Sequence, residues 1–351
     1  MAFQYTSKEA WLTKTEADLK GKSLSDLNWI LTDAISQSPL THQEDITHSD
    51  LKPLTEGRKN NAWNIGEDIH ISQNEKQANV DALAALEGGA TAITFHHDDK
   101  VDLAQLLKDI NLEWINTYFI GEADIINDFI KVSEKDKNQN LQLVNCGFYN
   151  TKLENIKQYV NKLPLATFHL IEVEENQDIA IEVAAIAIDY LRLAEELSEE
   201  DTDILNTISI DIKLTDQFLV NISKIRACKL VLHQIIEALK INVSLPKIRG
   251  SVAASSIVAD EDYNKIKMMP HALSGIIGGV QELYLPPSSA DAGKAVFHRR
   301  ISRNINHLLE QESYMGRVLD PSAGSYYIES LTDKIANKAW TIIQKNQTQA
   351  G

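Results

Sequence analysis

Side chains that could take part in chemistry recur along the chain, each near the end of a short apolar run. They are His96, His97, Cys146, His169, Glu172, Asp211, Lys213, Arg249 and Ser251. Imidazoles and carboxylates that converge on one point could bind a divalent metal ion, and a buried lysine could form a Schiff base. The simpler interpretation is that one histidine of the His96–His97 pair packs at a strand end, while the acidic residues and Lys213 face solvent. We favour this interpretation, so these residues alone assign no catalytic group and no metal site.

Several motifs with specific chemistry are absent from the sequence, among them the Walker loop, G-x-G-x-x-G, H-E-x-x-H, G-x-S-x-G and C-x-x-C. Asp68-Ile69-His70 begins like the D-x-H-x-x-G signature of cobalamin-binding modules, but Gln73 stands where that signature has glycine, so we treat the match as chance. Cys146 and Cys228 are the only cysteines, which excludes a disulfide framework and predicts a reducing, cytoplasmic location.

The apolar runs alternate with longer stretches of helical periodicity, which indicates repeated strand–helix units. The predicted strands span residues 64–71, 92–96, 113–120, 141–148, 166–173, 206–212, 242–248 and 281–285. The helices that follow them span residues 76–87, 102–110, 124–133, 153–163, 178–197, 216–239, 262–276 and 291–309. Eight such units predict an α/β fold, a closed (β/α)8 TIM barrel. A doubly wound open sheet is the alternative, but the turn at residues 72–75 lacks the glycines of its phosphate-binding loop.

The two ends of the chain do not follow this alternation, and the sequence therefore predicts three parts. Residues 1–60 form an N-terminal arm, with a helix at 11–20 and a short strand at 28–31, that packs on something else. Residues 61–315 form the barrel. Residues 316–351 form a C-terminal strap, turned at Asp320-Pro321 and Gly324, and a last helix at 332–344 that Thr332 caps.

Charge limits the partners that this chain can have. Of its 351 residues, 34 are Lys or Arg and 50 are Asp or Glu, so the formal net charge is −16. A nucleic acid or an anionic membrane would need a local basic patch, and the largest basic cluster is His298-Arg299-Arg300 with Arg303. The sequence has neither a secretory signal nor an apolar run near the ~20 residues of a membrane span. We expect no nucleic acid and no membrane as a partner.

The most distinctive stretch is D-P-S-A-G-S-Y-Y-I-E-S-L-T-D at residues 320–333, which resembles the D-P-x-x-G-S-Y-Y-x-E-x-L-T-D motif of the methylmalonyl-CoA mutase family. Further family elements occur in the same order at residues 16–29, 222–227, 278–283 and 299–304. The resemblance spans nearly the whole chain and is weakest in the first half of the barrel. On this set of motifs the chain is identified as a member of the family.

The resemblance implies a (β/α)8 barrel that binds an acyl-CoA along its axis. A separate carboxy-terminal α/β module of the family binds cobalamin and closes the barrel mouth. The reaction is a radical rearrangement between methylmalonyl-CoA and succinyl-CoA, started from adenosylcobalamin. Some bacterial enzymes of the family pair a catalytic large subunit with a similar, non-catalytic small one.

Departures from the family pattern predict whether this chain is of the catalytic or of the non-catalytic type. The seventh-strand motif R-x-H-x-Q keeps Arg249 but has Ser251 in place of the catalytic histidine and Ala253 in place of the glutamine. Residues 168–175 and 283–286 lose polar positions, which predicts a mouth filled by apolar side chains. The family's T-x-Y-R-G-R-P-W segment has no good counterpart at residues 57–71, and no cobalamin module follows Trp340.

We therefore expect the small, non-catalytic subunit of a heteromeric methylmalonyl-CoA mutase. This chain would bind no cofactor, and adenosylcobalamin would enter the complex through a catalytic large subunit, docked on the arm and the strap. Vestigial or ligand-binding residues would be Arg249, Gln281, His169 and His96. The alternatives are the barrel chain of a split acyl-CoA mutase with a separate cobalamin-binding subunit, which retention of Arg249 and Gln281 would allow, and a solitary acyl-CoA-binding barrel. The acidic net charge counts against an anionic CoA ester as this chain's own ligand.

Overall fold

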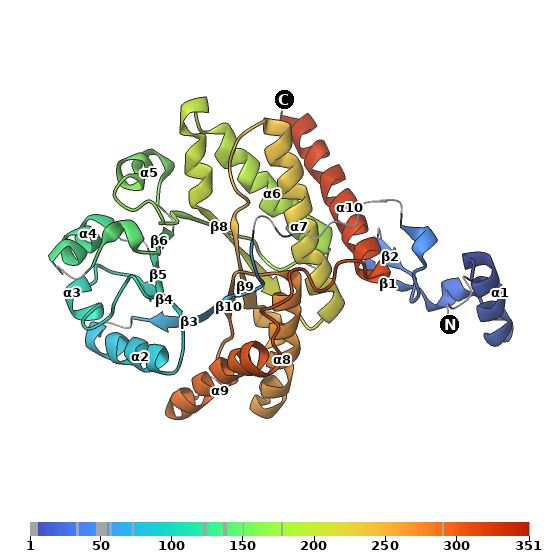
Figure 1. Ribbon diagram of the computed structural model, residues 1–351, viewed down its shortest axis with the longest axis horizontal. Helices are drawn as coiled ribbons and strands as arrows, with labels where there is room; N and C mark the ends of the chain where they lie inside the picture. The colour runs from blue at the N-terminus through green and yellow to red at the C-terminus, as the bar shows by residue number, and fades with distance from the viewer. Residues whose placement is uncertain are drawn as a thin grey trace.

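The computed structural model describes residues 6–32, 35–46, 55, 58–71, 74–121, 125–135, 139–149, 151–176, 178–289 and 291–350. Eight of its strands are parallel and form one sheet that curls into a barrel (Figure 1). They are β3 (Asn64–His70), β4 (Ala92–His97), β5 (Asn116–Gly121), β6 (Cys146–Tyr149), β7 (His169–Glu172), β8 (Ile208–Leu214), β9 (Lys247–Val252) and β10 (Glu282–Tyr284).

The sheet closes on itself, although one seam is thin. The strands pair in the order β6-β5-β4-β3-β10-β9-β8-β7, and a single bridge between Gly147 and Thr167 joins β6 to β7. The predicted (β/α)8 barrel is confirmed, and the open doubly wound sheet is excluded. Some of the predicted features lie outside the described residues. They are the start of the helix predicted at residue 124, parts of the arm that include Gly57, and Gln73.

A helix follows each strand and packs on the outside of the barrel. These helices are α2 (Glu75–Glu87), α3 (Leu103–Leu106), α4 (Ile126–Lys135), α5 (Leu153–Val160), α6 (Ile179–Glu195), α7 (Phe218–Leu239), α8 (Glu261–Gly278) and α9 (Ala295–His307). Most bounds lie close to the predicted ones. The helix predicted at residues 102–110 is much shorter, because Asp109 adopts a left-handed conformation (φ 63°) and Asn79 binds the carbonyl groups of Leu106 and Lys108.

Local sequence signals explain why these helices begin and end where they do. Asp102, Asp178 and Asp260 cap α3, α6 and α8, and each carboxylate accepts hydrogen bonds from backbone N–H groups of the first turn. α2 ends at Gly88–Gly89, where Gly89 has φ 91°. β9 begins five residues later than predicted, after Pro246, because proline has no N–H for the strand ladder.

Two apolar cores lie between the strands and their helices. One joins β3–β6 to α2–α5 and includes stacked rings of Phe95, Phe119 and Phe148. The other joins β7–β10 to α6, α7 and α8 and to the last helix, α10 (Tyr326–Ala350). Since successive strand residues point to opposite faces, every second strand residue is left to fill the inside of the barrel.

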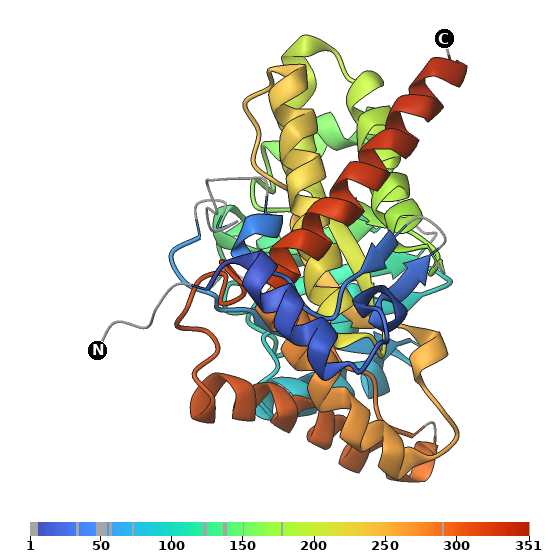
Figure 2. The ribbon, with the colours of Figure 1, turned by 90° about the vertical axis from the view of Figure 1, so that its right-hand side faces the viewer.

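The N-terminal segment extends away from the barrel. Its helix α1 (Lys8–Asp18) has no buried residue and lies farthest from the barrel body (Figure 1). Strands β1 (Trp29–Thr32) and β2 (Ile35–Gln37) form an antiparallel pair. Lys334 of α10 donates to the Ser36 carbonyl (2.8 Å) and to Gln37 Oε1 (2.9 Å). Figure 2 shows this hairpin near the first half of α10, which runs over α6 and α7.

The strap and the last helix differ from the prediction in one respect. α10 begins at Tyr326, six residues before the predicted cap, and Thr332 is fully buried in its second turn, so the expectation that Thr332 caps this helix is wrong. The chain turns at Gly324 (φ 82°), whose N–H donates to Glu329 Oε1 (3.0 Å). A carboxylate from the first turn therefore replaces the expected cap.

Two of the family-like motifs, at residues 222–227 and 320–333, contact each other in the folded chain. Arg226 of α7 is 2% exposed and donates through Nη2 to both Glu329 carboxylate oxygens (2.8 Å each) and through Nη1 to Asp320 of the strap. On the same helix, Lys224 binds Glu182 of α6 (2.7 Å). Lys224 and Arg226, two polar residues of the family-like motif in α7, thus connect the strap, α10 and α6 to the barrel by buried ion pairs.

Candidate functional site: the mouth of the barrel

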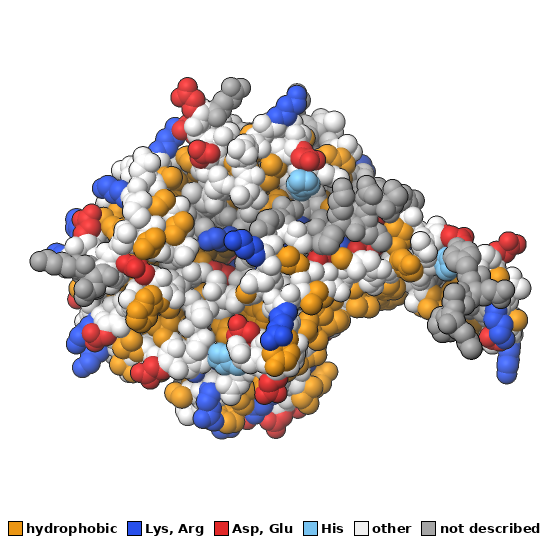
Figure 3. Space-filling model, viewed as in Figure 1, with side chains coloured by type: hydrophobic (Ala, Val, Ile, Leu, Met, Phe, Trp, Pro, Cys, Tyr) orange, Lys and Arg blue, Asp and Glu red, His pale blue; other side chains and the backbone are white. Residues whose placement is uncertain are grey.

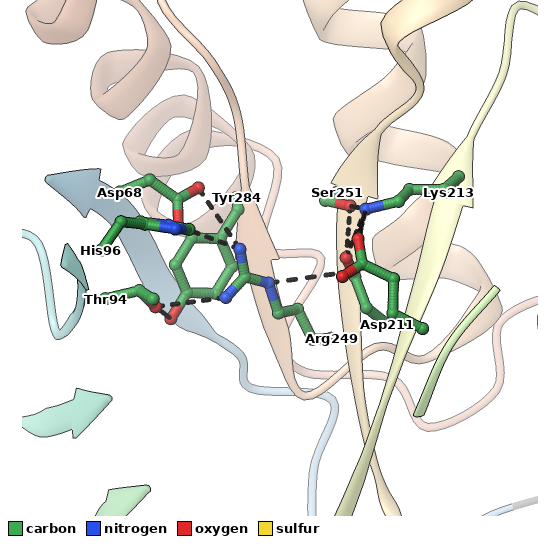
Figure 4. A network of polar contacts seen from close by, with 9 residues as sticks. Asp68, Thr94, His96, Asp211, Lys213, Arg249, Ser251 and Tyr284 are labelled. Carbon is green, nitrogen blue, oxygen red and sulfur yellow. Dashed lines mark hydrogen bonds and ion pairs between the residues drawn. The ribbon is translucent and has the colours of Figure 1, made fainter. Parts of the chain in front are cut away.

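The carboxyl ends of the strands carry a network of polar side chains that converge on the barrel mouth (Figure 4). The network is made by Asp68 (β3), Thr94 and His96 (β4), Asp211 and Lys213 (β8), Arg249 and Ser251 (β9) and Tyr284 (β10). Three of these strands, β4, β8 and β9, contribute two residues to the network at positions i and i+2, because alternate residues of a strand point to the same face. This is the end of a barrel at which enzymes of this fold place their functional groups.

Arg249 stands at the centre of one half of the network. Its Nη2 atom lies 3.0 and 3.3 Å from the two carboxylate oxygens of Asp68, and its Nη1 atom donates to Thr94 Oγ1 (3.1 Å). The guanidinium stacks on the ring of Tyr284, 3.6 Å from the ring centroid. His96 Nε2 lies 2.9 Å from Asp68 Oδ1. Arg249 is therefore almost fully paired within the chain.

Lys213 organises the other half of the network. Its Nζ atom contacts Asp211 Oδ2 (2.7 Å), Ser251 Oγ (3.2 Å) and the carboxylate of Glu172 on β7. The Ser251 hydroxyl donates to Asp211 Oδ2 (2.9 Å). The expectation that Lys213 faces solvent is wrong, because these acceptors draw its ammonium group into the mouth.

The charges of the network stabilise its ionised forms. Burial alone raises the pKa of Asp68, but Arg249 and His96 outweigh this effect and bring the pKa to about 2. Burial lowers the pKa of Lys213, yet Asp211 and Glu172 more than compensate, so its pKa is raised. A Schiff base needs a neutral amine, which this environment disfavours. Burial and the neighbouring His96 ring, 4.5 Å away, lower the pKa of His70.

Two adjoining hollows open at the mouth. The first has a volume of about 350 Å³ and is lined by residues of the network together with His70, Ile120, Leu170 and Glu172. The second, of about 570 Å³, shares Ile120, Leu170, Glu172 and Lys213 with the first. It extends over Tyr149 and Ala253 to Glu174 and Glu175. The prediction that apolar side chains fill the mouth is wrong, because charged side chains on four strands line it.

The structure brings together only some of the residues singled out in the sequence. Arg249 and His96 meet through Asp68, and Ser251 binds Asp211 and Lys213. Ala253 is buried beside the second hollow.

Other predicted residues lie elsewhere. His169, at the start of β7, faces the helices and lines a separate hollow with residues of α5 and α6. Gln281 precedes β10 at its amino end, where its Oε1 accepts from the Ile248 N–H (2.7 Å). Cys146 points into the core behind β6.

Thr94, Tyr284 and Asp68 belong to the network although none of them was predicted from the sequence as a site residue. A usable signal was present, since Asp68 and His70, Thr94 and His96, Asp211 and Lys213, and Arg249 and Ser251 each stand two residues apart on a predicted strand. Such spacing places both side chains of a pair on one face of the sheet. It does not say whether that face is the inside or the outside of the barrel.

The structure also gives evidence on a metal site, on a membrane-spanning helix and on a basic surface patch. Within the described residues, no three His, Cys, Asp or Glu side chains gather closely enough to hold a metal ion. None of the helices in the described part of the chain is long and apolar enough to cross a bilayer. The basic cluster at residues 298–303 does not form a patch, because His298 is buried and Arg303 binds Glu67. On the face shown in Figure 3, Lys and Arg side chains are dispersed.

The fold and its mouth define a barrel protein of the class that carries functional groups at the strand ends. Residues 167–351 match the family model described as methylmalonyl-CoA mutase. The chain belongs to the methylmalonyl-CoA mutase family. The matched region is the second half of the barrel together with the strap and α10, where the sequence resemblance is also strongest.

Individual relatives agree with this assignment. The methylmalonyl-CoA mutase small subunit of Porphyromonas gingivalis is 28% identical over 99% of this chain and 64% of that protein. The methylmalonyl-CoA mutase of Cereibacter sphaeroides is 25% identical over 98% of this chain and 58% of that protein. The large subunit of Propionibacterium freudenreichii is 28% identical over 54% of this chain and 27% of its own length. The chain thus spans about three fifths of the length of the first two relatives.

Proposed function

We propose that this chain is the small, non-catalytic subunit of a heteromeric methylmalonyl-CoA mutase. The observation that carries the proposal is that the chain's own side chains occupy the axis along which the family's acyl-CoA is expected to lie. Tyr118, Tyr149 and Tyr284 point inward and are at most 5% exposed, and Arg249 stacks on Tyr284. Two inward glycines make room for these rings.

The glycines show how closely the axis is packed. A Cβ atom on Gly66 would lie 2.4 Å from the Tyr284 ring, and one on Gly147 would lie 2.4 Å from the Tyr118 ring. Below the rings, Glu282 accepts from Asn116 (2.8 Å) and from the Tyr118 hydroxyl. A pantetheine chain entering along the axis would have to displace this buried layer, which costs its ring packing and its hydrogen bonds.

The charges at the mouth support the same conclusion. The two hollows are lined by the carboxylates of Asp68, Glu172, Glu174, Glu175 and Asp211, against the cations of Arg249 and Lys213. Both cations are already paired within the chain. A CoA ester carries several phosphate charges, and the described residues that line the two hollows offer them no free cation.

The cofactor of the complex is proposed to be held by the partner. Adenosylcobalamin, when bound in such an enzyme, supplies the radical that starts the rearrangement. The D-x-H stretch of this chain does not fit a cobalamin site, because Asp68 is bound by Arg249 and His96 and His70 stacks on His96. We infer that this chain binds no cofactor itself.

The arm and the strap are proposed to dock on the catalytic large subunit. Leu27, Trp29, Ile30 and Leu40 are large apolar residues of the arm that remain exposed, with Ile30 at 69%. Figure 3 shows apolar side chains along the edge that joins the arm to the barrel body. Such an exposed apolar surface on an extended segment fits burial against another chain.

Co-expression with the large subunit from the same genome tests the proposal. We expect the two chains to purify at equal stoichiometry and to convert methylmalonyl-CoA to succinyl-CoA when adenosylcobalamin is added. The large chain alone should be unstable or inactive, and acetyl-CoA should leave the melting temperature of this chain alone unchanged. Full activity of the large chain without this subunit would contradict the proposal.

The split-mutase alternative predicts a different outcome of the same experiment. There, this chain would support turnover with a small cobalamin-binding protein and no second barrel chain. Its residues would have to bind the acyl-CoA through Arg249 and Gln281. Arg249 is held by Asp68 and Thr94, and Gln281 binds backbone at the opposite end of the strands, so no specific contact favours this alternative.

A further inference from the structure

We propose that the outward face of α8 is a docking surface for the catalytic large subunit, in which a helix of that subunit packs along a stripe of apolar side chains. The inference rests on the proposed function for the identity of the partner, whereas the surface itself is defined by exposed residues of this chain. It adds a second contact, on the body of the barrel, to the one proposed for the arm.

The outward face of α8 carries apolar residues at a regular spacing. They stand alternately three and four positions apart, at Tyr263, Ile266, Pro270, Leu273 and Ile277, and are called here the α8 stripe. Tyr263 is 52% exposed and Ile266 is 69% exposed, and Pro270 is exposed as well. Residues three and four apart lie on one side of a helix, and this alternation is the spacing at which two helices meet in a coiled coil.

The α8 stripe is not the face by which the helix packs on the barrel. That face carries Met268, Ala272 and Ile276, which are at most 1% exposed and belong to the core shared with β7–β10. α8 therefore has apolar residues on two opposite faces, and the chain buries one of them. A helix that is apolar on both faces is typical of an element that is covered from both sides.

Helix α4 shows what a solvent-facing helix of this barrel carries instead. Its exposed residues are all polar, namely Asn127, Lys131, Glu134 and Lys135. In α8, by contrast, Tyr263, Ile266 and Pro270 are three of the four exposed residues. Exposed apolar side chains in a continuous row mark an interaction site more often than single ones do.

Apolar exposure extends from the α8 stripe onto the start of α9. Val296 is 79% exposed and Phe297 is 46% exposed. Lys265 Nζ of α8 lies 5.8 Å from the centroid of the Phe297 ring, and Lys294 pairs with Glu261 (3.3 Å). These contacts hold the first turns of the two helices side by side, so both contribute to one surface.

The size of the α8 stripe indicates that its partner also covers other surface. Residues 263–277 span about 21 Å of a helix that is about 10 Å wide, so the stripe offers roughly 200 Å². Each side of a stable interface buries about 800 Å². The exposed apolar residues of the arm supply further area, and Figure 3 shows apolar side chains from the part of the body where α8 lies to the base of the arm. A partner that touches both surfaces can reach the required area.

Charge favours the large subunit over a second copy of this chain as that partner. Two copies would each bring a formal net charge of −16, and charges of one sign oppose self-association. The proposed large subunit belongs to the same family, so we expect a helix at the position of α8 in its barrel as well. A two-fold arrangement of similar barrels brings equivalent helices together, and α8 would then pack on its counterpart.

A photo-crosslinker on the α8 stripe tests the proposal with the full chain and the large subunit. Cys146 and Cys228 are buried, so a cysteine introduced at an exposed position can be labelled selectively. Labelled Ile266→Cys should crosslink to the large subunit, whereas labelled Val80→Cys, at a 50% exposed apolar position of α2, should not. Attachment of the Ile266→Cys label to a second copy of this chain, or equal crosslinking from both positions, would overturn the proposal.

Affinity provides an independent measurement. The double variant Tyr263→Gln/Ile266→Gln should raise the dissociation constant for the large subunit at least tenfold, as measured by analytical ultracentrifugation. The melting temperature of the isolated variant should stay within about 2 °C of the original, because both side chains are exposed. Val80→Gln should change neither quantity. If the unmodified chain binds and the double variant binds equally well, only the α8 stripe is refuted. If the unmodified chain does not bind the large subunit at all, the proposed function is refuted as well.

Discussion

Arg249 and Lys213 look like residues that would bind a ligand, but each forms ion pairs with carboxylates of the same chain. Each is a cation at the carboxyl end of a barrel strand, and each is matched by acceptors from neighbouring strands. A buried ion pair adds little net stability over apolar packing, but the loss of one partner leaves a buried charge without compensation. The mouth network is therefore sensitive to single substitutions.

Removal of the Arg249 side chain tests this sensitivity. Arg249→Leu should lower the free energy of unfolding by about 3 kcal/mol, because Asp68 and Asp211 would lose their shared cation. The measurement is urea unfolding followed by circular dichroism. Arg192→Leu removes an exposed ion pair with Asp189 and should cost less than about 1 kcal/mol. Equal effects of the two substitutions would contradict the central role of Arg249.

Lys229 gives a prediction about pH. This side chain of α7 is 5% exposed and donates to the carbonyl groups of Gly278 and Gly279, and burial lowers its pKa to about 8 from 10.5. Because the unfolded chain holds this proton more tightly, the contribution of Lys229 to stability increases as the pH rises from about 8 to 10. Lys229→Met should abolish this part of the pH dependence. Lys131→Met, at an exposed position, should leave it intact, and an unchanged slope in Lys229→Met would show that the residue does not carry it.

At the scale of elements, α7 is the helix on which the second half of the molecule is assembled. Three buried cations along it bind three different neighbours, with Lys224 reaching α6, Arg226 reaching the strap and α10, and Lys229 reaching the end of α8. An unpaired cation at any of these sites would be costly, so the three contacts fix the positions of the elements that they join.

The Arg226 contact can be tested separately from global stability. Arg226→Met should release the strap, and hydrogen exchange of residues 313–331 should become at least tenfold faster, while exchange in β3–β6 changes little. Glu329→Gln keeps one oxygen acceptor and should have a smaller effect. Glu312→Gln is exposed and serves as the control. Uniformly faster exchange throughout the chain would contradict a local role for this contact.

At the scale of the whole molecule, the barrel is stabilised by its own packing, whereas helix α1 of the arm gains little stability from contacts within the chain. The barrel has its own two cores, whereas α1 buries no residue within the chain. A helix that buries nothing in its own chain gains little stability there, since helices depend on packing for most of theirs. This fits a segment whose packing partner is another subunit.

Deletion of residues 1–22 tests that separation. The melting temperature of the isolated chain should change by no more than about 2 °C, because none of the described residues 6–22 is buried. Binding to the large subunit should weaken at least tenfold, as measured by analytical ultracentrifugation of the mixed chains. Undiminished binding would rule out α1 as a docking element.

Prediction from the sequence succeeded where the cause is local. The alternation of strand and helix periodicity predicts the barrel, and the Asp residues before α3, α6 and α8 mark where those helices begin. The predicted start of α10 was wrong because Glu329 determines the first turn of this helix. Glu329 is held in place by Arg226, which lies about a hundred residues earlier in the chain. The outward position of His169 could not be read from a strand whose two faces are both buried.

The sequence by itself determined the fold and the family, because backbone periodicity, helix caps and family motifs are properties of neighbouring residues. The sequence resemblance also predicts that Ser251 and Ala253 stand at the positions of the family's catalytic histidine and glutamine. Only the tertiary structure decided what the barrel interior contains. Asp68 and Arg249 are 181 residues apart, and they meet because parallel strands bring their carboxyl ends to one opening. Such long-range electrostatic pairing gave the mouth its ionic network instead of the apolar filling that the sequence predicted.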